Sequence, residues 1–430
     1  MPLKFLLKQD NDKIIIENND ENITWQQLKN TISASQALLL NKNAKSCALF
    51  SHDAHQFIAT FLGCIYLGID IFLAPNNSKE MEKKLQADVY IGDFHANETL
   101  PLSTNAIQHN NKTSHIVFFT SGSGGEPKKI KRKLSQLLSE IEQSSKLWEI
   151  LINKSLFASS VSYQHIYGLL FSILLPLVNK RMIWHHPLPF EESLQRLVAE
   201  QKNTVLVSSP AFLKRLTLTL DEQHGEKLKV FCSGGLLSQT QHQATEQRLN
   251  CEVIQVYGST ETGGIAFRST AHRWQFMPLV KHKINNNSLW VKSPMCYTDQ
   301  WIDTQDKIKL QADGFDLLGR KDRIVKIEEK RIALAEVEHF IKQNDNIKET
   351  YTICINEHRQ YIAAIITLST QGKKLLQETS EKAVKLHLKS FLKGKIEPLA
   401  MPRKIRILAE IPCNSQGKKV YNDILKIFNP

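Results

Sequence analysis

The feature that most constrains this sequence is a series of short apolar runs, each of which ends in a polar or glycine-rich turn. Residues 116–119, 205–208, 230–232 and 253–256 are four such runs in the middle of the chain. Helix-like segments follow the turns, so the pattern predicts parallel βα units of an α/β fold. Ligands of such sheets bind beyond the carboxyl ends of the strands, which makes these turns candidate binding segments.

The length and the charge pattern divide the chain into two parts. With 430 residues, the chain exceeds one compact core of ordinary size, so two or three domains are expected. Near Asp313 the composition changes and the chain becomes more basic. From Arg320 onward it carries 22 Lys or Arg and 13 Asp or Glu residues, a formal charge of +9. We therefore expect a large α/β domain over residues 1–318 and a smaller, basic domain over residues 319–430.

The smaller part has its own secondary-structure pattern. Residues 351–356 and 361–368 are strand-like, and residues 381–392 are helix-like. This alternation predicts a small α+β domain.

Composition excludes several classes of protein. Hydrophobic residues make up 42% of the chain and charged residues 23%, which is typical of a folded globular protein. The N-terminal residues have no long apolar core, which argues against a secretory signal. The longest apolar stretch, residues 167–178, contains Pro176 and is shorter than the ~20 residues needed to span a bilayer. It predicts a buried helix, and no transmembrane segment is expected.

Cysteine usage and net charge narrow the choice of compartment and partner. The seven cysteines are scattered and form no CxxC pair, which disfavours disulfides and a thiolate zinc site and favours the cytoplasm. The net charge of +12 favours acidic partners, namely nucleotides, phosphorylated cofactors, nucleic acid or an acidic protein. The basic run of residues 128–133 reads as a solvated face that attracts phosphate. No aromatic interleaving accompanies it, so nucleic acid is not an expected partner.

Two of the turns carry side chains suited to a phosphorylated ligand. Residues 120–128 read TSGSGGEPK and combine hydroxyls, exposed backbone N–H groups and a lysine, although their spacing is not that of a P-loop. Residues 257–261 read YGSTE, in which a ring could stack on adenine, a hydroxyl could meet an α-phosphate and a carboxylate could hold Mg²⁺. Taken alone, each motif is also compatible with an ordinary turn or helix cap.

Two further motifs follow toward the C-terminus. Asp306 precedes residues 319–322, GRKD, and a carboxylate with a nearby arginine can hold the hydroxyls of a ribose. A surface network of salt bridges would look the same. Residues 412–418, PCNSQGK, end in Lys418 on a glycine-containing loop, although most single lysines are merely solvated.

In this order the four motifs resemble those of the adenylate-forming superfamily of acyl-CoA synthetases, peptide-synthetase adenylation domains and luciferases. The family patterns TSGSTGxPK, YGxTE, GRxDxxxK and PxxxxGK correspond to residues 120–128, 257–261, 319–326 and 412–418. The resemblance runs from about Ile23 to the end of the chain. The stretch VKIEEKRIALAEVE further resembles a compact bacterial branch that accompanies aryl-polyene-type pathways and loads acyl or aryl acids onto an acyl carrier protein.

The resemblance implies roles for individual residues. The catalytic residues that it implies are Lys418, Glu261, Thr260 and His165, and Glu261 is also the implied Mg²⁺ ligand. The residues that it implies for binding the nucleotide and cofactors are Thr120, Ser121, Gly122, Ser123, Gly125, Lys128, Gly234, Gly235, Tyr257, Gly258, Asp306, Arg320 and Asp322. His165 and Gly168 match the HxxG motif that lines the acyl pocket, although a core histidine is the alternative.

Three positions depart from the family patterns. Gly124 stands where threonine is usual, Gln305 replaces the glycine before Asp306, and Glu329 replaces a glycine that lies against the pantetheine arm. The first two leave adenylation plausible, whereas Glu329 bears on the thiol-transfer step. Two histidine pairs, at residues 52 and 55 and at residues 185 and 186, lack an evident third metal ligand.

The resemblance implies an ATP- and Mg²⁺-dependent enzyme that converts a carboxylic acid to an acyl adenylate and then transfers the acyl group to a thiol. The small domain is expected to turn about Asp322 between the two steps. An aryl or short-to-medium acyl acid is expected, as is a phosphopantetheine acceptor on an acyl carrier protein. The alternatives are free coenzyme A as acceptor, or a nucleotide-binding regulator that has lost turnover.

Overall fold

The computed structural model describes residues 3–17, 22–95, 97–121, 127–200, 202–235, 237, 239–269, 273–320, 323–327, 330–356, 360–413, 419 and 421–428. The chain divides into two compact units: unit 1 is residues 1–282 with 291–302, and unit 2 is residues 283–290 with 303–430. This division falls earlier in the chain than residue 319, so a functional boundary at residue 319 stays a prediction. Within the described part of the chain, no helix is long and apolar enough to cross a membrane.

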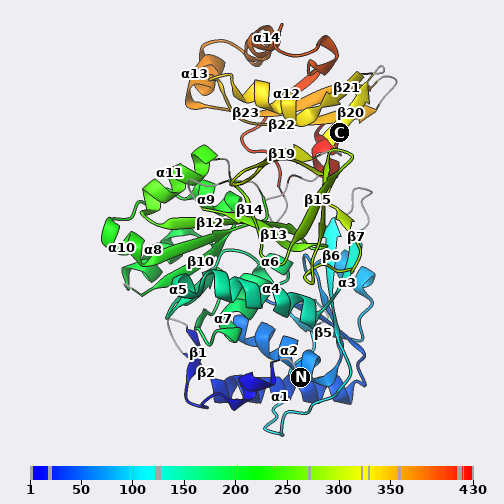
Figure 1. The fold of residues 1–430 in the computed structure, drawn as a ribbon, viewed down its shortest axis with the longest axis vertical. Coiled ribbons are helices and arrows are strands. Elements are labelled where there is room, and N and C mark those ends of the chain that lie inside the picture. The colour runs from blue at the N-terminus through cyan, green and yellow to red at the C-terminus, as the bar shows by residue number, and fades with distance from the viewer. Residues whose placement is uncertain are drawn as a thin grey trace. The chain divides into compact units, whose positions relative to one another are not determined.

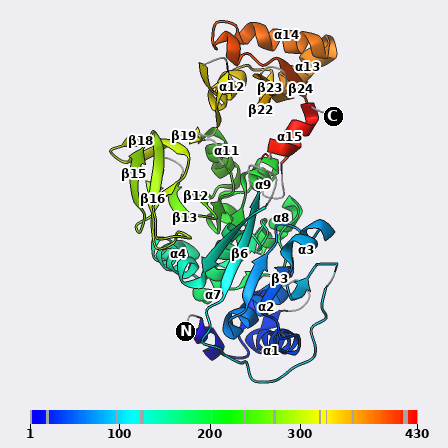
Figure 2. The same cartoon turned by 90° about the vertical axis from the view of Figure 1, so that its right-hand side faces the viewer.

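The first sheet of unit 1 carries the phosphate-loop motif. Its strand order is β5 (Val89–Gly92), β3 (Ser46–Phe50), β4 (Asp70–Leu73), β6 (His115–Ser121) and β7 (Pro127–Lys133). The first four strands are parallel, and β7 pairs antiparallel with β6 from Ser121 and Pro127 onward. The helices of this region are α1 (Trp25–Asn41), α2 (Ala54–Leu67) and α3 (Lys79–Leu85), seen beside the strands in Figure 2.

The second sheet of unit 1 has nine strands. Their order is β14 (Gln275–Phe276), β13 (Gly263–Arg268), β12 (Glu252–Ser259), β11 (Leu228–Cys232), β10 (Thr204–Ser208), β8 (Leu156–Ser159), β9 (Ile183–Trp184), β1 (Ile14–Glu17) and β2 (Ile23–Thr24). The strands from β12 to β1 are parallel. The apolar runs expected to form parallel strands are therefore confirmed, and three of them are neighbours in one sheet.

Both faces of the nine-stranded sheet are buried, which explains why its strands are apolar without alternation. Val205 and Phe231 point into one core, whereas Leu206 and Val230 point into the other. The helices α8 (Glu191–Ala199), α9 (Pro210–Arg215), α10 (Glu222–Glu226) and α11 (Gln239–Leu249) gather on one side of the sheet (Figure 1). The core of the opposite face includes residues of α4 (Leu134–Leu147), which is followed by α5 (Glu149–Ile152).

The apolar stretch of residues 167–178 is a buried helical segment, as expected. It comprises α6 (Ile166–Gly168), a π-helix (Leu169–Leu174) and α7 (Leu175–Val178). All six π-helical residues are buried. Short π-helical segments are rare and occur frequently at functional sites.

Unit 2 contains the predicted α+β elements. The strand β22 (Ile347–Asn356) pairs antiparallel with β23 (Gln360–Leu368), which pairs parallel with β24 (Lys404–Ile407). The strands β18 (Asp306–Gln311), β19 (Gly314–Arg320), β20 (Ile324–Ile327) and β21 (Lys330–Ala333) also lie in unit 2, whereas β15 (Lys281–Asn285), β16 (Ser288–Lys292) and β17 (Ile302–Asp303) have residues in both units. The helices are α12 (Leu334–Lys342), α13 (Thr370–Glu378), α14 (Glu381–Leu392) and α15 (Tyr421–Phe428). The two strands and the helix expected over residues 351–392 are confirmed.

Candidate active site

Two of the sequence motifs meet in unit 1. Lys128, at the start of β7, donates a hydrogen bond from Nζ to Oε1 of Glu261 over 3.3 Å. These residues are 133 positions apart and lie at the ends of different sheets. The fold thus brings Lys128, at the end of the TSGSGGEPK motif, and the YGSTE turn to one place, beyond the carboxyl ends of β6 and β12.

The YGSTE turn is a tight polar connection between β12 and β13. The backbone N–H of Ser259 donates to Oγ1 of Thr262 over 3.0 Å, and the N–H of Thr262 donates back to Oγ of Ser259 over 3.2 Å. Gly258 is required here, because a Cβ at this position would lie 2.2 Å from the carbonyl oxygen of Gly263. The turn is therefore held in one conformation by its own side chains and by close backbone packing.

The strand β7 corrects the expectation that residues 128–133 form a solvated basic face. Lys128, Lys129, Lys131 and Lys133 are exposed, but Arg132 is completely buried. Its Nη1 donates to the carbonyl oxygen of Thr260 over 2.6 Å, and its Nη2 donates to the carbonyl oxygen of Met295. A period-two strand puts positions 128, 130 and 132 on one face, and that face meets the YGSTE turn.

Glu140 on α4 reaches the other end of the same turn. Its Oε1 accepts a hydrogen bond from the backbone N–H of Gly264 over 2.9 Å. Burial raises the pKa of the Glu140 carboxyl to about 7, although the Arg132 charge and the Gly264 hydrogen bond oppose the rise. Neither Arg132 nor Glu140 was singled out by its sequence pattern, because Arg132 lies in a lysine-rich run and Glu140 lies in an amphipathic helix.

The turn after β11 lies beside the turn after β12. Ser233 donates a hydrogen bond from Oγ to the carbonyl oxygen of Val256 over 2.8 Å, so residues 233–235 are tied to the strand that carries Tyr257. Gly234 has a φ of 90°, which a residue with a side chain rarely adopts. The implied binding residues Gly234, Gly235, Tyr257 and Gly258 therefore belong to adjacent strand ends.

The HxxG segment occupies the start of the π-containing helix. The carbonyl oxygen of His165 accepts a hydrogen bond from the N–H of Leu169 over 2.8 Å. A Cβ at Gly168 would lie 2.0 Å from the carbonyl oxygen of Ser162, so this glycine is required by packing. The preceding Gln164 donates to the carbonyl oxygen of Ser51 over 2.7 Å and thereby links this segment to the loop after β3.

The implied ribose-binding residues lie in unit 2. Asp306 and Arg320 are directly opposite one another in the β18–β19 hairpin, and Asp306 is buried. Gln305, which replaces the usual glycine, has a φ of 61°. Its backbone N–H and its side-chain amide both donate to the carboxylate of Asp303, over 2.9 and 2.6 Å, and these bonds support a left-handed conformation in a residue other than glycine.

Several implied site residues lie outside the described residues. They are Gly122, Ser123, Gly125, Asp322 and Lys418, together with the departures Gly124 and Glu329. The side chains of Thr120 and Ser121 are likewise outside the description, although their backbone pairs with Lys128 and Pro127. The placement of the expected catalytic lysine therefore stays a prediction.

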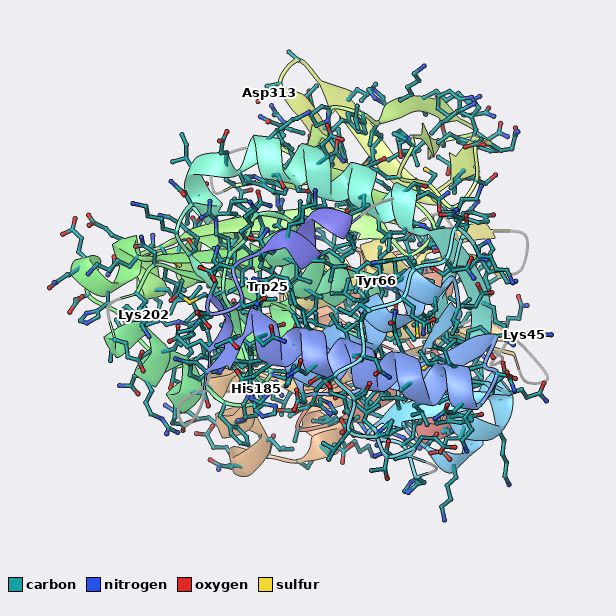
Figure 3. The ribbon with its side chains drawn as sticks, turned by 90° about the horizontal axis from the view of Figure 1, so that it is seen from below. Trp25, Lys45, Tyr66, His185, Lys202 and Asp313 are labelled. Atoms are coloured by element: carbon teal, nitrogen blue, oxygen red, sulfur yellow. The ribbon has the colours of Figure 1, made fainter. Side chains whose placement is uncertain are left out.

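The histidine pairs have carboxylate neighbours. His185 Nε2 lies 3.1 Å from Asp53 Oδ1, and His52 Nδ1 lies 2.9 Å from Asp93 Oδ2 (His185 is labelled in Figure 3). Burial opposes ionisation of Asp53, but the hydrogen bonds from His185 and from the Gln56 backbone lower its pKa to about 2. Among the residues that the structure describes, no group of three or more His, Cys, Asp or Glu side chains could hold a metal ion.

One open cavity in the described structure is away from the motifs. It has a volume of about 540 Å³ and is lined by Ser155, Asn203, Lys227 and Glu252, which lie at the amino ends of the parallel strands. Parallel α/β sheets place ligands at the opposite, carboxyl ends. The motif-bearing turns, rather than this cavity, therefore define the candidate site.

The parallel sheets, the joined TSGSGGEPK and YGSTE motifs and the C-terminal α+β elements define an adenylate-forming ligase fold. Residues 71–294, just over half of the chain, match the family model described as AMP-binding enzyme. The chain belongs to this family.

Curated relatives extend the similarity to nearly the whole chain. The D-alanine–D-alanyl carrier protein ligase of Staphylococcus haemolyticus is 23% identical, over 95% of this chain and 94% of that protein. The protein of the same name from Staphylococcus aureus is 22% identical, over 97% of this chain and 96% of that protein.

Solved structures have the same fold. An ATP-bound RpMatB–BxBclM chimera has a TM-score of 0.82 at 16% identity, over 99% of this chain and 98% of that chain. The o-succinylbenzoate CoA synthetase of Bacillus subtilis, in complex with its acyl-adenylate intermediate, has a TM-score of 0.78 at 15% identity, over 98% of this chain and 96% of that chain. The predicted fold class is confirmed, as is the adenylate-forming family.

Proposed function

We propose that this chain activates a carboxylic acid with ATP and then transfers the acyl group to the phosphopantetheine thiol of an acyl carrier protein. In the first step a carboxylate oxygen of the acid attacks the α-phosphorus, and the bond to the bridging oxygen breaks, so that pyrophosphate leaves. In the second step the thiolate attacks the acyl carbonyl and AMP leaves. Neither step needs a covalent bond to the enzyme, so catalysis consists of positioning and charge neutralisation.

The observation that carries the proposal is the contact between Lys128 and Glu261. It puts a cation of the glycine-rich loop and a carboxylate of the YGSTE turn within 3.3 Å in unit 1. The Glu261 side chain is about one-quarter exposed, and its carboxylate oxygens suit Mg²⁺, which would neutralise phosphate charge when bound. Lys128, Thr120 and Ser121 would meet the phosphates, and Tyr257 would stack on the adenine.

The remaining roles come from unit 2. Asp306 and Arg320 would hold the ribose, since a buried carboxylate opposite an arginine suits a pair of hydroxyls. Lys418 would neutralise the charge that develops between the acid and the α-phosphate. The segment from residue 319 onward would turn about Asp322 to exchange Lys418 for the thiol.

Three observations favour a carrier protein over free coenzyme A. The curated relatives that match over nearly their whole length are named for carrier proteins. The segment from Arg320 onward carries a formal charge of +9, which complements an acidic partner and would speed its association. Glu329 adds a negative charge near the expected thiol entrance, which would repel the additional phosphates of coenzyme A.

Pyrophosphate release by the purified full-length chain tests the first step. The acids to compare are benzoate-like, octanoate-like and palmitate-length acids together with D-alanine, the substrate in the names of the relatives. We expect ATP-dependent release with an aryl or short-to-medium acyl acid. If none of the acids elicits pyrophosphate release, the chain is better explained as a nucleotide-binding regulator.

A competition assay tests the acceptor. Enzyme, ATP and an accepted acid are mixed with equal concentrations of coenzyme A and a holo acyl carrier protein from the same organism. We expect faster thioester formation on the carrier protein and a preference that declines as salt is raised. Faster reaction with coenzyme A would reject the carrier-protein assignment while leaving the adenylation step intact.

A further inference from the structure

A buried arginine braces the carbonyl side of the YGSTE turn. Arg132 is fully buried, and its guanidinium donates to the carbonyl oxygens of Thr260 and Met295 and, over 3.4 Å, to Oε1 of Gln136. Thr260 immediately precedes Glu261, whose own carbonyl oxygen accepts from the N–H of Tyr297 over 2.8 Å. The backbone on either side of the Glu261 side chain is thus held by hydrogen bonds from outside the turn.

A buried carboxylate braces the amide side of the same turn. Glu140 is only 1% exposed, and its Oε1 accepts from the N–H of Gly264. A Cβ at Gly263 would lie 2.5 Å from Oε2 of Glu140, and one at Gly264 would lie 2.8 Å from Oε1. Gly263 also has a φ of 69°, so two successive glycines allow the carboxylate to lie directly against the turn.

Stability alone does not account for this arrangement. Oε2 of Glu140 is buried and has no hydrogen-bond partner among the described residues. Removing two charges from water costs several kcal/mol per ion, and well-packed apolar side chains are often as stabilising as a buried ion pair. An apolar pair could not donate to the Thr260 carbonyl or accept from the Gly264 amide. These two hydrogen bonds fix both ends of the five-residue segment from Thr260 to Gly264.

We propose that Arg132 and Glu140 are positioning residues for adenylate formation, which hold the segment from Thr260 to Gly264 so that Thr260 and Glu261 face the nucleotide. The inference rests on the proposed function, because it assigns these two side chains to the same site. Lys128 touches the Glu261 side chain, whereas Arg132 and Glu140 touch only the backbone of the turn. They act through the turn and make no contact with the reacting groups.

The decisive variant is the double replacement Arg132→Met with Glu140→Leu. It removes both charges together, so it avoids a buried unpaired charge and should be less destabilised than either single replacement by an apolar residue. The turn nevertheless loses its donors and its acceptor. We expect pyrophosphate release to fall by about 100-fold, the loss that a displacement of about 1 Å can cause. We also expect AMP, titrated calorimetrically without metal, to bind about tenfold more weakly.

Two further variants sharpen the test. Arg132→Lys keeps the cation but offers a single ammonium in place of the planar fork, so an intermediate rate is expected. Tyr66→Phe is the matched control. Tyr66 is on α2, far along the chain from the turn, and is labelled in Figure 3. The replacement removes a buried hydrogen bond of 3.2 Å from its hydroxyl to the carbonyl oxygen of Leu3. Its rate and AMP affinity should stay within about twofold of the wild type.

The outcomes separate the inference from the proposed function. A folded double variant that releases pyrophosphate and binds AMP within about twofold of the wild type would overturn the positioning role. If the wild type itself releases no pyrophosphate with any acid, the proposed function fails, and the AMP titration still decides whether the pair shapes the nucleotide site. If the double variant does not fold, the conservative Arg132→Lys variant decides, since wild-type rate and affinity in it would reject the inference.

Discussion

Unit 1 and unit 2 each contain an arginine that contacts the backbone and is adjacent to a predicted functional residue, but the two arginines lie in different surroundings. In unit 1, Arg132 is fully buried beside Glu140 and holds the YGSTE turn. In unit 2, Arg323 is 23% exposed, pairs with both carboxylate oxygens of Glu338 at 3.0 and 2.7 Å, and donates to the carbonyl oxygen of Thr352 over 2.8 Å. The Arg132 side chain is shielded from water and has the Glu140 carboxyl as its nearby charge, whereas the Arg323 side chain is in contact with water.

In unit 2, Arg323 and Lys419 both lie over the ring of Tyr351 on β22, and each is the sequence neighbour of a predicted functional residue. The Arg323 guanidinium lies 4.4 Å from the Tyr351 ring centroid, and Lys419 Nζ lies 5.3 Å from it. Arg323 follows the predicted hinge residue Asp322, and Lys419 follows the predicted catalytic Lys418. Substitution of a partly hydrated cation costs less stability than substitution of a buried one. We therefore expect replacements at Arg132, beside the YGSTE turn, to be more destabilising than replacements at Arg323, beside β22.

The largest expected effect separates the two arginines directly. Arg132→Ala leaves Glu140 buried without its cation and should lower the free energy of unfolding by about 3–5 kcal/mol. Arg323→Ala leaves Glu338 within reach of water and should cost about 1–2 kcal/mol. Denaturant unfolding of both variants measures the difference, and equal losses would show that burial does not distinguish the two sites.

The next largest effect is expected on the rate of adenylate formation, where Lys418 is compared with its neighbour Lys419. Lys418→Ala should lower pyrophosphate release by about 100- to 1000-fold while ATP still binds, because a preorganised cation at the developing charge is lost. Lys419→Ala is the matched control. It loses a 3.3 Å hydrogen bond to the Thr350 carbonyl oxygen and the contact with Tyr351, and should keep most of the activity. A Lys418→Ala variant within about tenfold of the wild type would refute the assignment of Lys418.

The buried Glu140 carboxyl is expected to make the stability of unit 1 depend on pH. Burial raises the pKa of Glu140 from 4.5 to about 7, so the folded protein keeps this proton to a higher pH than the unfolded chain does. The resulting stabilisation is fully present below pH 4.5 and is lost as the pH rises through about 7. The contribution of Glu140 to the free energy of unfolding should therefore fall by up to about 3 kcal/mol across this interval.

The matched variant for this pH effect is Glu140→Gln, which keeps the shape and the acceptor for Gly264 but does not titrate. Unfolding of wild type and variant is compared at several values between pH 4.5 and 7.5. The difference between the two curves isolates the Glu140 proton. Parallel curves would mean that Glu140 titrates equally in the folded and unfolded states.

The smallest effect is expected at the Tyr351 ring. Tyr351→Leu removes the surface that Arg323 and Lys419 face and should lower the free energy of unfolding by about 1 kcal/mol. Tyr351→Phe retains the ring and should remain close to the wild type. If the phenylalanine variant is destabilised as much as the leucine variant, the hydroxyl rather than the ring supports the strand.

Much of the fold was predictable because it depends on local patterns. Short apolar runs ending in glycine-rich turns predicted parallel strands, and the runs at residues 205–208, 230–232 and 253–256 are adjacent parallel strands. The motifs at residues 120–128 and 257–261 predicted that these two segments would lie close together, and Lys128 contacts Glu261. These features can be predicted from the sequence because strand burial and turn conformation each produce a residue pattern over a few positions.

The buried polar pair was not predictable in this way. Arg132 has the same sequence surroundings as four exposed lysines, and only the close approach of β7 to the YGSTE turn, 128 residues away, removes it from water. Glu140 likewise resembles a solvated helix residue until Gly263 and Gly264 are packed against it. Whether a charge is solvated depends on which distant segment covers it, and no local pattern encodes that.

The sequence by itself therefore determined the α/β class and the adenylate-forming family, and it predicted the turns that we propose as the site. The tertiary structure decided which side chains support those turns. It also decided that the β18–β19 hairpin, which carries Asp306 and Arg320, belongs to the C-terminal unit rather than to the large one. The physical reason is common to both cases: periodicity and turn propensity are properties of neighbouring residues, whereas burial and packing are properties of segments that meet only in the folded chain.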